Sequence, residues 1–175
     1  MEWGSVRGVR RLEALGSTAL PIIQMAAEQL EPASADTERL DAVRHMNSGF
    51  SKIYSLLLKG FPIYDSRVAS ALGSLVQAYC KEAGLQTVPV ALAFGLPPSQ
   101  GRANRDPSDG LLRFRPLWYG APRQYAISNL MAAWLLGVLA HHGPFGELPA
   151  ERGLLALESA LFMIGYARVE SGAIR

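Results

Sequence analysis

The sequence predicts an all-α fold, and three observations carry that prediction. Apolar residues repeat at helical spacing in several stretches, no stretch shows the alternation of a β-strand, and Gly and Pro mark the breaks between the stretches. The 175 residues, 49% of them hydrophobic, are enough to bury a core. We therefore expect one compact helical domain over residues 1–175.

Composition limits the location and the partners of the protein. The net charge of +2 is mild, so it permits nucleic-acid binding without implying it. No apolar run approaches the roughly 18 residues that cross a bilayer, and the N-terminal stretch lacks the pattern of a secretory signal. The single cysteine, Cys80, excludes an intramolecular disulfide and fits a reducing cytoplasm. We expect a cytoplasmic protein without a membrane partner; a monomer is favoured, with the oligomeric state left open.

Two helices are expected before residue 46. Residues 17–31 keep their apolar positions on one face, behind an N-cap at Ser17 or Thr18. Residues 36–44 fit a short helix that begins at an aspartate. Residues 46–49 then form a turn, because Asn and Gly tolerate positive φ.

The middle of the chain predicts two further helices. The first spans about residues 50–58, and Phe61–Pro62 after it is extended because a residue before proline avoids the α region. Asp65 or Ser66 caps a long helix that ends at Gly84. Its apolar positions at helical spacing are Val68, Leu72, Leu75, Val76 and Tyr79.

The second half combines irregular chain with two long helices. Residues 87–93 are a short apolar piece, and residues 95–122 hold five prolines, four glycines and four arginines without a clear period. A stretch of that length is more often a functional loop than packing filler. Helices follow at about 123–141 and 149–166. Their expected core positions are Met131, Trp134, Leu135, Val138, Leu154, Leu157, Leu161 and Ile164.

Lys52 is one of only three lysines, and it lies within a strongly apolar helix. Its aliphatic stem can pack while the amine reaches a cleft, and partial burial would favour a neutral amine that attacks a sugar C1′ or a carbonyl. A surface lysine that extends its amine to solvent has the same pattern, and the periodicity by itself favours that simpler interpretation.

Asp65 stands where a helix is about to begin. As an N-cap it accepts backbone N–H groups, which is a purely structural role and the more frequent one. At the mouth of a cleft the same carboxylate could stabilise positive charge on a ribose or activate a water.

Lys52 and Asp65 together resemble the active-site segment of the helix-hairpin-helix DNA glycosylases, and more narrowly the 8-oxoguanine DNA glycosylase-like branch. Met46-Asn47-Ser48-Gly49-Phe50-Ser51-Lys52 stands in the place of the family's hairpin and lysine, and Pro62-Ile63-Tyr64-Asp65 in the place of its Pro-x-Asp motif. The resemblance covers about residues 36–80. The turn lacks the family's Pro-Gly and second Gly, and the interval from Lys52 to Asp65 is shorter than usual. The N-terminal lobe must be reduced or supplied by later helices.

The resemblance implies a glycosylase-like helical fold and base excision from DNA. We expect no cofactor and no metal site. The target nucleotide is flipped into a pocket, Lys52 attacks C1′ as the base leaves, and Asp65 stabilises the oxocarbenium-like sugar. A Schiff base at Lys52 would permit strand nicking. Without an aligned lysine, Asp65 could support base excision by water. The base removed, and a role in repair or in defence against modified phage DNA, stay open.

Expected DNA contacts follow from the resemblance and from the composition of the irregular stretch. The turn would offer its backbone to a phosphate, with Arg67 as a further phosphate or Asp65 partner. Arginines neutralise phosphate, and aromatic rings stack on bases. The expected DNA-binding residues are Asn47, Ser48, Gly49, Ser51, Arg67, Arg102, Arg105, Arg113 and Arg115, beside Arg123 and Phe114, and the expected stacking or pocket residues are Phe50, Tyr64, Trp118 and Tyr119. A solvated loop held by two buried aromatics explains the irregular stretch equally well.

Two functions from other classes remain as alternatives. One is a non-catalytic DNA-binding module that keeps the hairpin. The other is a helical domain that binds a protein partner, with Lys52 and Asp65 unrelated. His141 and His142 are adjacent on a helix end and do not form a metal pair, because no further ligand stands at a suitable spacing.

Overall fold

The computed structural model describes residues 13–99, 105–118 and 120–171, and it confirms the all-α class. The described residues form no β-strand, only two isolated β-bridges. None of the described helices is both long and apolar enough to cross a lipid bilayer. The helices are α2 (Ala19–Leu30), α3 (Ser48–Leu57), α4 (Ser66–Glu82), α5 (Pro122–Leu139) and α6 (Ala150–Ser171), with 3₁₀ turns η1 (Gly16–Thr18), η2 (Val90–Leu92) and η3 (Gly143–Phe145).

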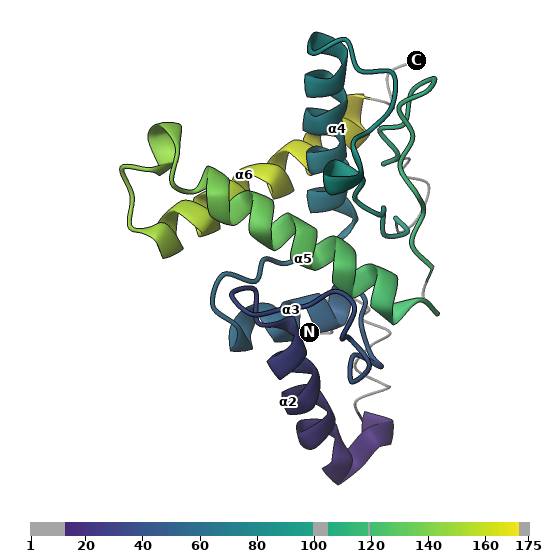
Figure 1. Ribbon diagram of the computed structural model, residues 1–175, viewed down its shortest axis with the longest axis vertical. Coiled ribbons are helices and arrows are strands. Elements are labelled where there is room, and N and C mark those ends of the chain that lie inside the picture. The colour runs from purple at the N-terminus through teal and green to yellow at the C-terminus, as the bar shows by residue number, and fades with distance from the viewer. Residues whose placement is uncertain (1–12, 100–104, 119, 172–175) are drawn as a thin grey trace.

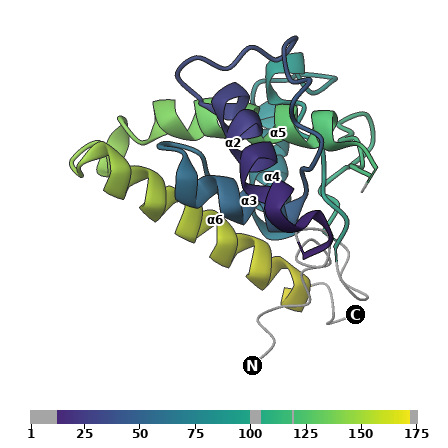
Figure 2. The same cartoon turned by 90° about the horizontal axis from the view of Figure 1, so that it is seen from below.

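The helices are arranged around a V formed by α5 and α6. These two helices diverge from the turn at η3, as the view from below shows (Figure 2). α6 packs along α4 and crosses behind α5, while α2 and α3 lie at the opposite end of the molecule from the C-terminal end of α4 (Figure 1). The start of α4 therefore lies near the middle of the molecule.

Two side chains set the starts of α3 and α4 in the same way. Oδ1 of Asn47 accepts hydrogen bonds from the N–H groups of Gly49 and Phe50, at 2.8 and 3.1 Å. Oδ1 of Asp65 accepts from the N–H groups of Arg67 and Val68, at the same two distances. Each cap satisfies helix donors that have no partner within the helix. The predicted cap at Asp65 is confirmed, and α4 ends as expected at Gly84, whose φ of +67° suits glycine.

Side chains from α3 and α5 hold the extended segment between α3 and α4. Oγ of Ser51 accepts the Tyr64 N–H at 2.6 Å and donates to Oδ1 of Asn129 at 2.8 Å. Nδ2 of Asn129 donates to the Pro62 carbonyl at 2.9 Å, and the hydroxyl of Tyr125 donates to the Tyr64 carbonyl at 2.6 Å. Ser51, Asn129 and Tyr125 are buried, so these bonds form away from water.

The same network reaches the irregular chain after α4. The hydroxyl of Tyr64 donates to the Gly95 carbonyl at 2.7 Å, and the Gly95 N–H donates to Oγ of Ser128 at 3.0 Å. A side chain at Gly95 would overlap Leu117 and Ser128. The glycine therefore allows this close approach between the chain and α5.

The irregular stretch from Gly84 to α5 lies along α4 (Figure 1). Gly73 of α4 leaves room for Pro107 and Phe114, and Nε2 of Gln77 donates to the Pro107 carbonyl. An ion pair of 2.6 Å joins Lys81 to Asp109. Leu112, Phe114 and Leu117 are buried, so they anchor residues 112–117 in the core.

The prediction of a helix at residues 36–44 is wrong, because the structure has turns there. Oδ1 of Asp36 accepts the Glu38 N–H at 2.9 Å in a local turn, and Oε1 of Gln29 accepts the Ala42 N–H at 2.8 Å. Leu40 and Val43 are nevertheless buried as expected. Side chains thus take the backbone bonds that a helix would have used.

Several predicted core positions face solvent instead. Leu75 and Tyr79 of α4, Trp134 and Val138 of α5 and Ile164 of α6 are exposed. On α5 the buried face contains Tyr125, Asn129, Leu130, Ala133 and Leu136. Apolar residues surround α5 on nearly all sides, so spacing could not identify its inner face.

Two buried serines provide a matched test of this network. Ser51→Ala should lower the free energy of unfolding by about 1–3 kcal/mol, because it leaves the Tyr64 N–H and the side-chain oxygen Oδ1 of Asn129 without their partner. Ser70→Ala should be nearly neutral, because Oγ of Ser70 is buried with no hydrogen-bond partner among the described residues. Urea unfolding of both variants measures the difference, and equal losses would contradict the role given to Ser51.

Candidate functional site at the start of α4

Asp65 combines a structural contact with a free oxygen. Oδ1 is used by the cap on α4, whereas Oδ2 has no hydrogen bond to a described residue. The residue is half-buried, so the carboxylate is fixed in direction and still reachable from solvent. A carboxylate held in this way can act on positive charge that develops in front of it.

Arg67 anchors α6 beside Asp65. Its guanidinium lies over the ring of Phe162, 4.4 Å from the centroid, and 5.6 Å from the centroid of Tyr166. A side chain at Gly165 would overlap the Arg67 carbonyl, so the two helices meet backbone to backbone there. Cation–π contacts and this close packing fix the orientation of Arg67.

Arg105 reaches the same place from the irregular stretch. Its Nη1 donates to Oγ of Ser66 at 3.0 Å, and its Nε is buried without a hydrogen-bond partner among the described residues. Burial lowers the pKa of the Arg105 guanidinium, the nearby charge of Arg67 lowers it further, and the charge of Asp65 raises it. A guanidinium remains protonated at neutral pH, so Arg105 brings a positive charge into the surroundings of Asp65, with the charge of Arg67 close to Arg105.

Glu158 of α6 adds a second carboxylate that sequence reasoning missed. Its Oε2 accepts the Ile63 N–H at 3.2 Å, two residues before Asp65. Burial raises the pKa of the Glu158 carboxyl, the bond from Ile63 lowers it, and the charge of Asp65 raises it. The only sequence signal was an acidic residue among the apolar positions of α6, which helix periodicity alone does not mark as functional.

The start of α4 therefore gathers Asp65, Glu158, Arg67 and Arg105. The two guanidinium groups favour an anion such as a phosphate, and a fixed carboxylate favours a developing cation. The described residues contain no group of three His, Cys, Asp or Glu side chains that could hold a metal ion. Asp65 and Glu158 can supply electrostatic stabilisation and proton transfer.

Lys52 is not bonded to this group. It is half-buried on α3, and within the described part of the chain its amine forms neither a hydrogen bond nor an ion pair. Its neighbours Ser51 and Tyr54 are buried, whereas Leu56 is exposed. By helix geometry Lys52 lies nearer to the side of Leu56 than to the side of Phe50 and Tyr54.

The turn predicted at residues 46–49 is wrong in part, because Ser48 and Gly49 already belong to α3 and neither has a positive φ; most of these residues are engaged inside the protein. Asn47 caps α3, which occupies the N–H groups of Gly49 and Phe50. The hydroxyls of Ser48 and Tyr125 share a hydrogen bond of 2.9 Å, and Ser51 is buried in the network described above. Ser51 is buried and its N–H donates to the Asn47 carbonyl at 2.8 Å, so the DNA contact predicted for Ser51 does not fit its place in the structure.

Phe50 and Tyr64 belong to the core. They are 1% and 0% exposed, and Tyr64 packs edge-on against Tyr125. The prediction that they stack on a base or line its pocket does not fit this burial, because neither ring has a free face.

The arginines of the irregular stretch divide into inner and outer positions. Arg113 and Arg115 are exposed, as is Trp118 at 72%, while Phe114 between the two arginines is buried. Arg123 pairs with Glu38 at 3.5 Å and donates to the Thr37 carbonyl, so it holds the turn region after α2. Arg102 and Tyr119 lie outside the described residues.

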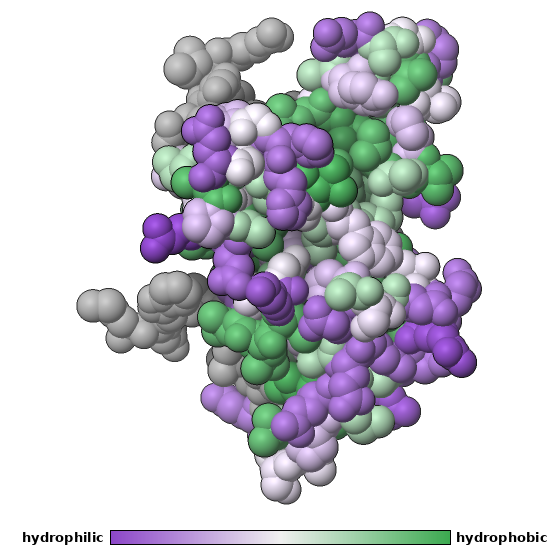
Figure 3. All heavy atoms as spheres, turned by 60° about the vertical axis from the view of Figure 1, so that its left-hand side comes forward, coloured by the Kyte–Doolittle hydropathy of each residue, from purple (hydrophilic) through white to green (hydrophobic). Residues whose placement is uncertain are grey.

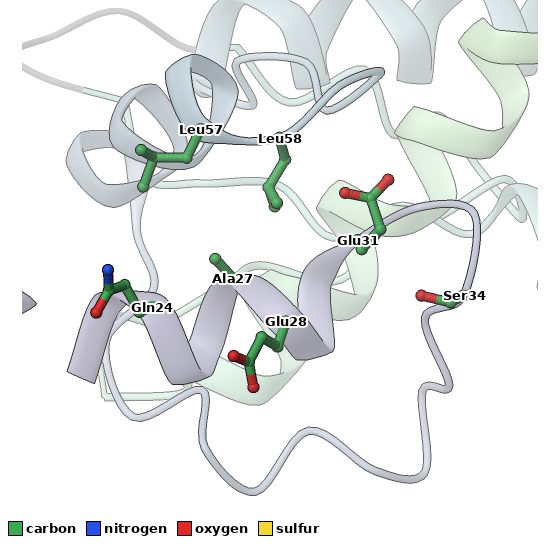
Figure 4. Close-up of a pocket in the computed structure, with 7 residues that line it drawn as sticks. All are labelled: Gln24, Ala27, Glu28, Glu31, Ser34, Leu57 and Leu58. Atoms are coloured by element: carbon green, nitrogen blue, oxygen red, sulfur yellow. The ribbon is translucent and has the colours of Figure 1, made fainter. Parts of the chain in front are cut away.

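An open groove of the described surface lies elsewhere, between α2 and α3. It encloses about 680 Å³ and is lined by Gln24, Ala27, Glu28, Glu31, Ser34, Leu57 and Leu58 (Figure 4). Apolar side chains also reach the surface in patches separated by polar ones (Figure 3). The groove contains neither Lys52 nor Asp65. It gives no support to a pocket for a flipped base at the predicted residues.

Comparison with protein-family models, with curated proteins and with solved structures gave no match. The site is therefore interpreted from its own residues and geometry.

Asp65 variants separate its capping role from its charge. Asp65→Ala should lower the free energy of unfolding by about 1 kcal/mol, because the N–H groups of Arg67 and Val68 lose their acceptor. The free energy of unfolding of Asp65→Asn should stay within a few tenths of a kcal/mol of the wild-type value, since Asn caps helices about as well as Asp. Thermal and urea unfolding provide the measurement. A large loss in Asp65→Asn would mean that the charge itself stabilises the fold.

Gly165 tests the contact that places α6 beside Asp65. Gly165→Ala should cost about 1–3 kcal/mol, because its new Cβ would overlap the Arg67 carbonyl and push α6 from α4. Gly137→Ala on α5 is the control, since nothing lies within 4 Å of a Cβ there. That change should stabilise by about 0.5–1 kcal/mol through helix propensity. Similar effects of both changes would contradict the close contact at Gly165.

Proposed function

We propose that this protein is a DNA glycosylase that excises a damaged or modified base. The single observation that carries the proposal is Asp65 itself. Its carboxylate is fixed by two backbone N–H groups, keeps one oxygen without a described partner, and lies near two arginines. A fixed anion beside phosphate-binding groups suits a reaction that builds positive charge on a sugar within DNA.

The chemistry uses two residues. The bond between C1′ and the base breaks and its electron pair leaves with the base, which gives an oxocarbenium-like sugar that Asp65 stabilises. The amine of Lys52 attacks C1′ and loses a proton, and ring opening then gives a Schiff base at that carbon. If Lys52 does not reach C1′, a water attacks instead and the product is an abasic site.

DNA binding would rest on the exposed cationic groups. Arg115 and Arg113 on the irregular stretch neutralise phosphates, and Trp118 offers an open ring to a base. Arg67 and Arg105 would hold the phosphate next to the flipped nucleotide.

A non-catalytic DNA-binding module is the second candidate. The observation that favours it is the position of Lys52, which forms no bond to Asp65 in the part of the chain that the structure describes. A domain that binds a protein partner is the third candidate.

Borohydride trapping on duplex DNA with an abasic site tests the proposal. The wild type and Asp65→Asn should give a covalent adduct, and Lys52→Ala should give none, because only a primary amine forms the reducible Schiff base. Lys59→Ala is the matched control, since this exposed lysine pairs with Glu151 and should leave the adduct unchanged. No adduct with the wild type would remove the lysine chemistry.

DNA affinity measured on the same variants separates the alternatives. A non-catalytic DNA binder gives no adduct, and its affinity falls as salt rises in both the wild type and Lys52→Ala. A protein-interaction domain has little affinity for DNA at any salt concentration.

A further inference from the structure

Glu158 lies on the face of α6 that packs against the segment carrying Asp65. Gly165 follows it by two helical turns and meets the backbone of Arg67, and Leu161 between them is buried. Residues seven apart on a helix share a face, so Glu158 is directed toward α4 and the chain before it. α6 therefore brings a carboxylate to this place by helix packing and not by local sequence.

The bond from Ile63 completes the pairing of the segment before α4. The Pro62 carbonyl is held by Asn129, and the Tyr64 N–H and carbonyl by Ser51 and Tyr125. The Ile63 N–H is held by Glu158 at 3.2 Å. Four backbone groups of residues 62–64 are thus fixed by side chains from α3, α5 and α6, directly before Asp65.

The charges around Glu158 link it to the same carboxylate. Its surroundings include the anion of Asp65, and Asp65 in turn lies near Arg105, which is close to Arg67. Burial and the charge of Asp65 both raise the pKa of Glu158. Protonation of Glu158 removes one of two neighbouring negative charges.

We propose that Glu158 is the positioning residue for Asp65. It holds the Ile63 amide and so fixes the direction in which Asp65 enters the N-cap, and its charge state sets the field at the Asp65 carboxylate. The catalytic consequence rests on the proposed glycosylase function. The coupling between Glu158 and Asp65 is a property of the fold and is tested without any substrate.

Glu158→Gln removes the charge and keeps an acceptor for the Ile63 amide. Because the folded state raises the pKa of Glu158, its contribution to stability is full below the ordinary pKa and is lost as the pH rises through the raised value. Glu158→Gln should therefore raise the thermal midpoint at pH 7. This gain should vanish at about pH 4, near or below the ordinary carboxyl pKa. Glu147→Gln is the control, an exposed glutamate just before α6 that should give little change at either pH.

The same substitution in an Asp65→Asn background measures the coupling. Removal of the Asp65 charge should reduce the gain from Glu158→Gln at pH 7, because Asp65 is one cause of the raised pKa. Strictly additive midpoint shifts at pH 7 would overturn the inference, as would a gain from Glu158→Gln that persists unchanged at pH 4.

Trapping kinetics supply the functional half of the test. Glu158→Gln should shift the pH dependence of the rate of adduct formation, whereas Glu147→Gln should leave that dependence unchanged. If the role of Glu158 is purely structural, Glu158→Gln changes the adduct yield without shifting the pH dependence. If the wild type forms no adduct, the lysine chemistry of the proposed function fails, and the double-mutant cycle still decides whether Glu158 acts on Asp65.

Discussion

The structure depends on one short segment whose backbone is paired by side chains from three other helices. Pro62, Ile63 and Tyr64 cannot use helix or sheet bonds, so Asn129, Ser51, Tyr125 and Glu158 supply the partners. Buried backbone groups are costly when unpaired, and this set of bonds therefore specifies the relative positions of α3, α5 and α6. Tyr64 extends the same constraint to Gly95 and the irregular stretch.

This constraint gives Asp65 its dual character. The segment enters α4 in one direction, and the cap then uses a single carboxylate oxygen. An N-cap is an ordinary structural device, but this one has Arg105 and a second, half-buried carboxylate, Glu158, in its surroundings. Rigid support from the core allows such a charged group to keep its geometry without a ligand.

Local sequence signals identified the elements that depend on neighbouring residues. The cap at Asp65, the end of α4 at Gly84 and the extended Phe61–Pro62 follow from short-range stereochemistry. The short helix at residues 36–44 did not form, because Gln29 and Asp36 compete for its backbone donors. Phe50, Tyr64 and Ser51 are buried and do not belong to a surface that could contact DNA. The sequence could not show this, since apolar and small polar residues occur both in cores and in pockets.

By itself the sequence determined the helical class, most helix limits and the identity of Asp65 as a helix cap, because these depend on spacing, propensity and local hydrogen bonds. Only the tertiary structure decided which side of α5 is buried and which charges surround Asp65. Glu158 lies 93 positions after Asp65 in the chain, and Arg105 lies 40 after it. Helix packing brings them together, and no pattern of neighbouring residues records a contact made across such distances.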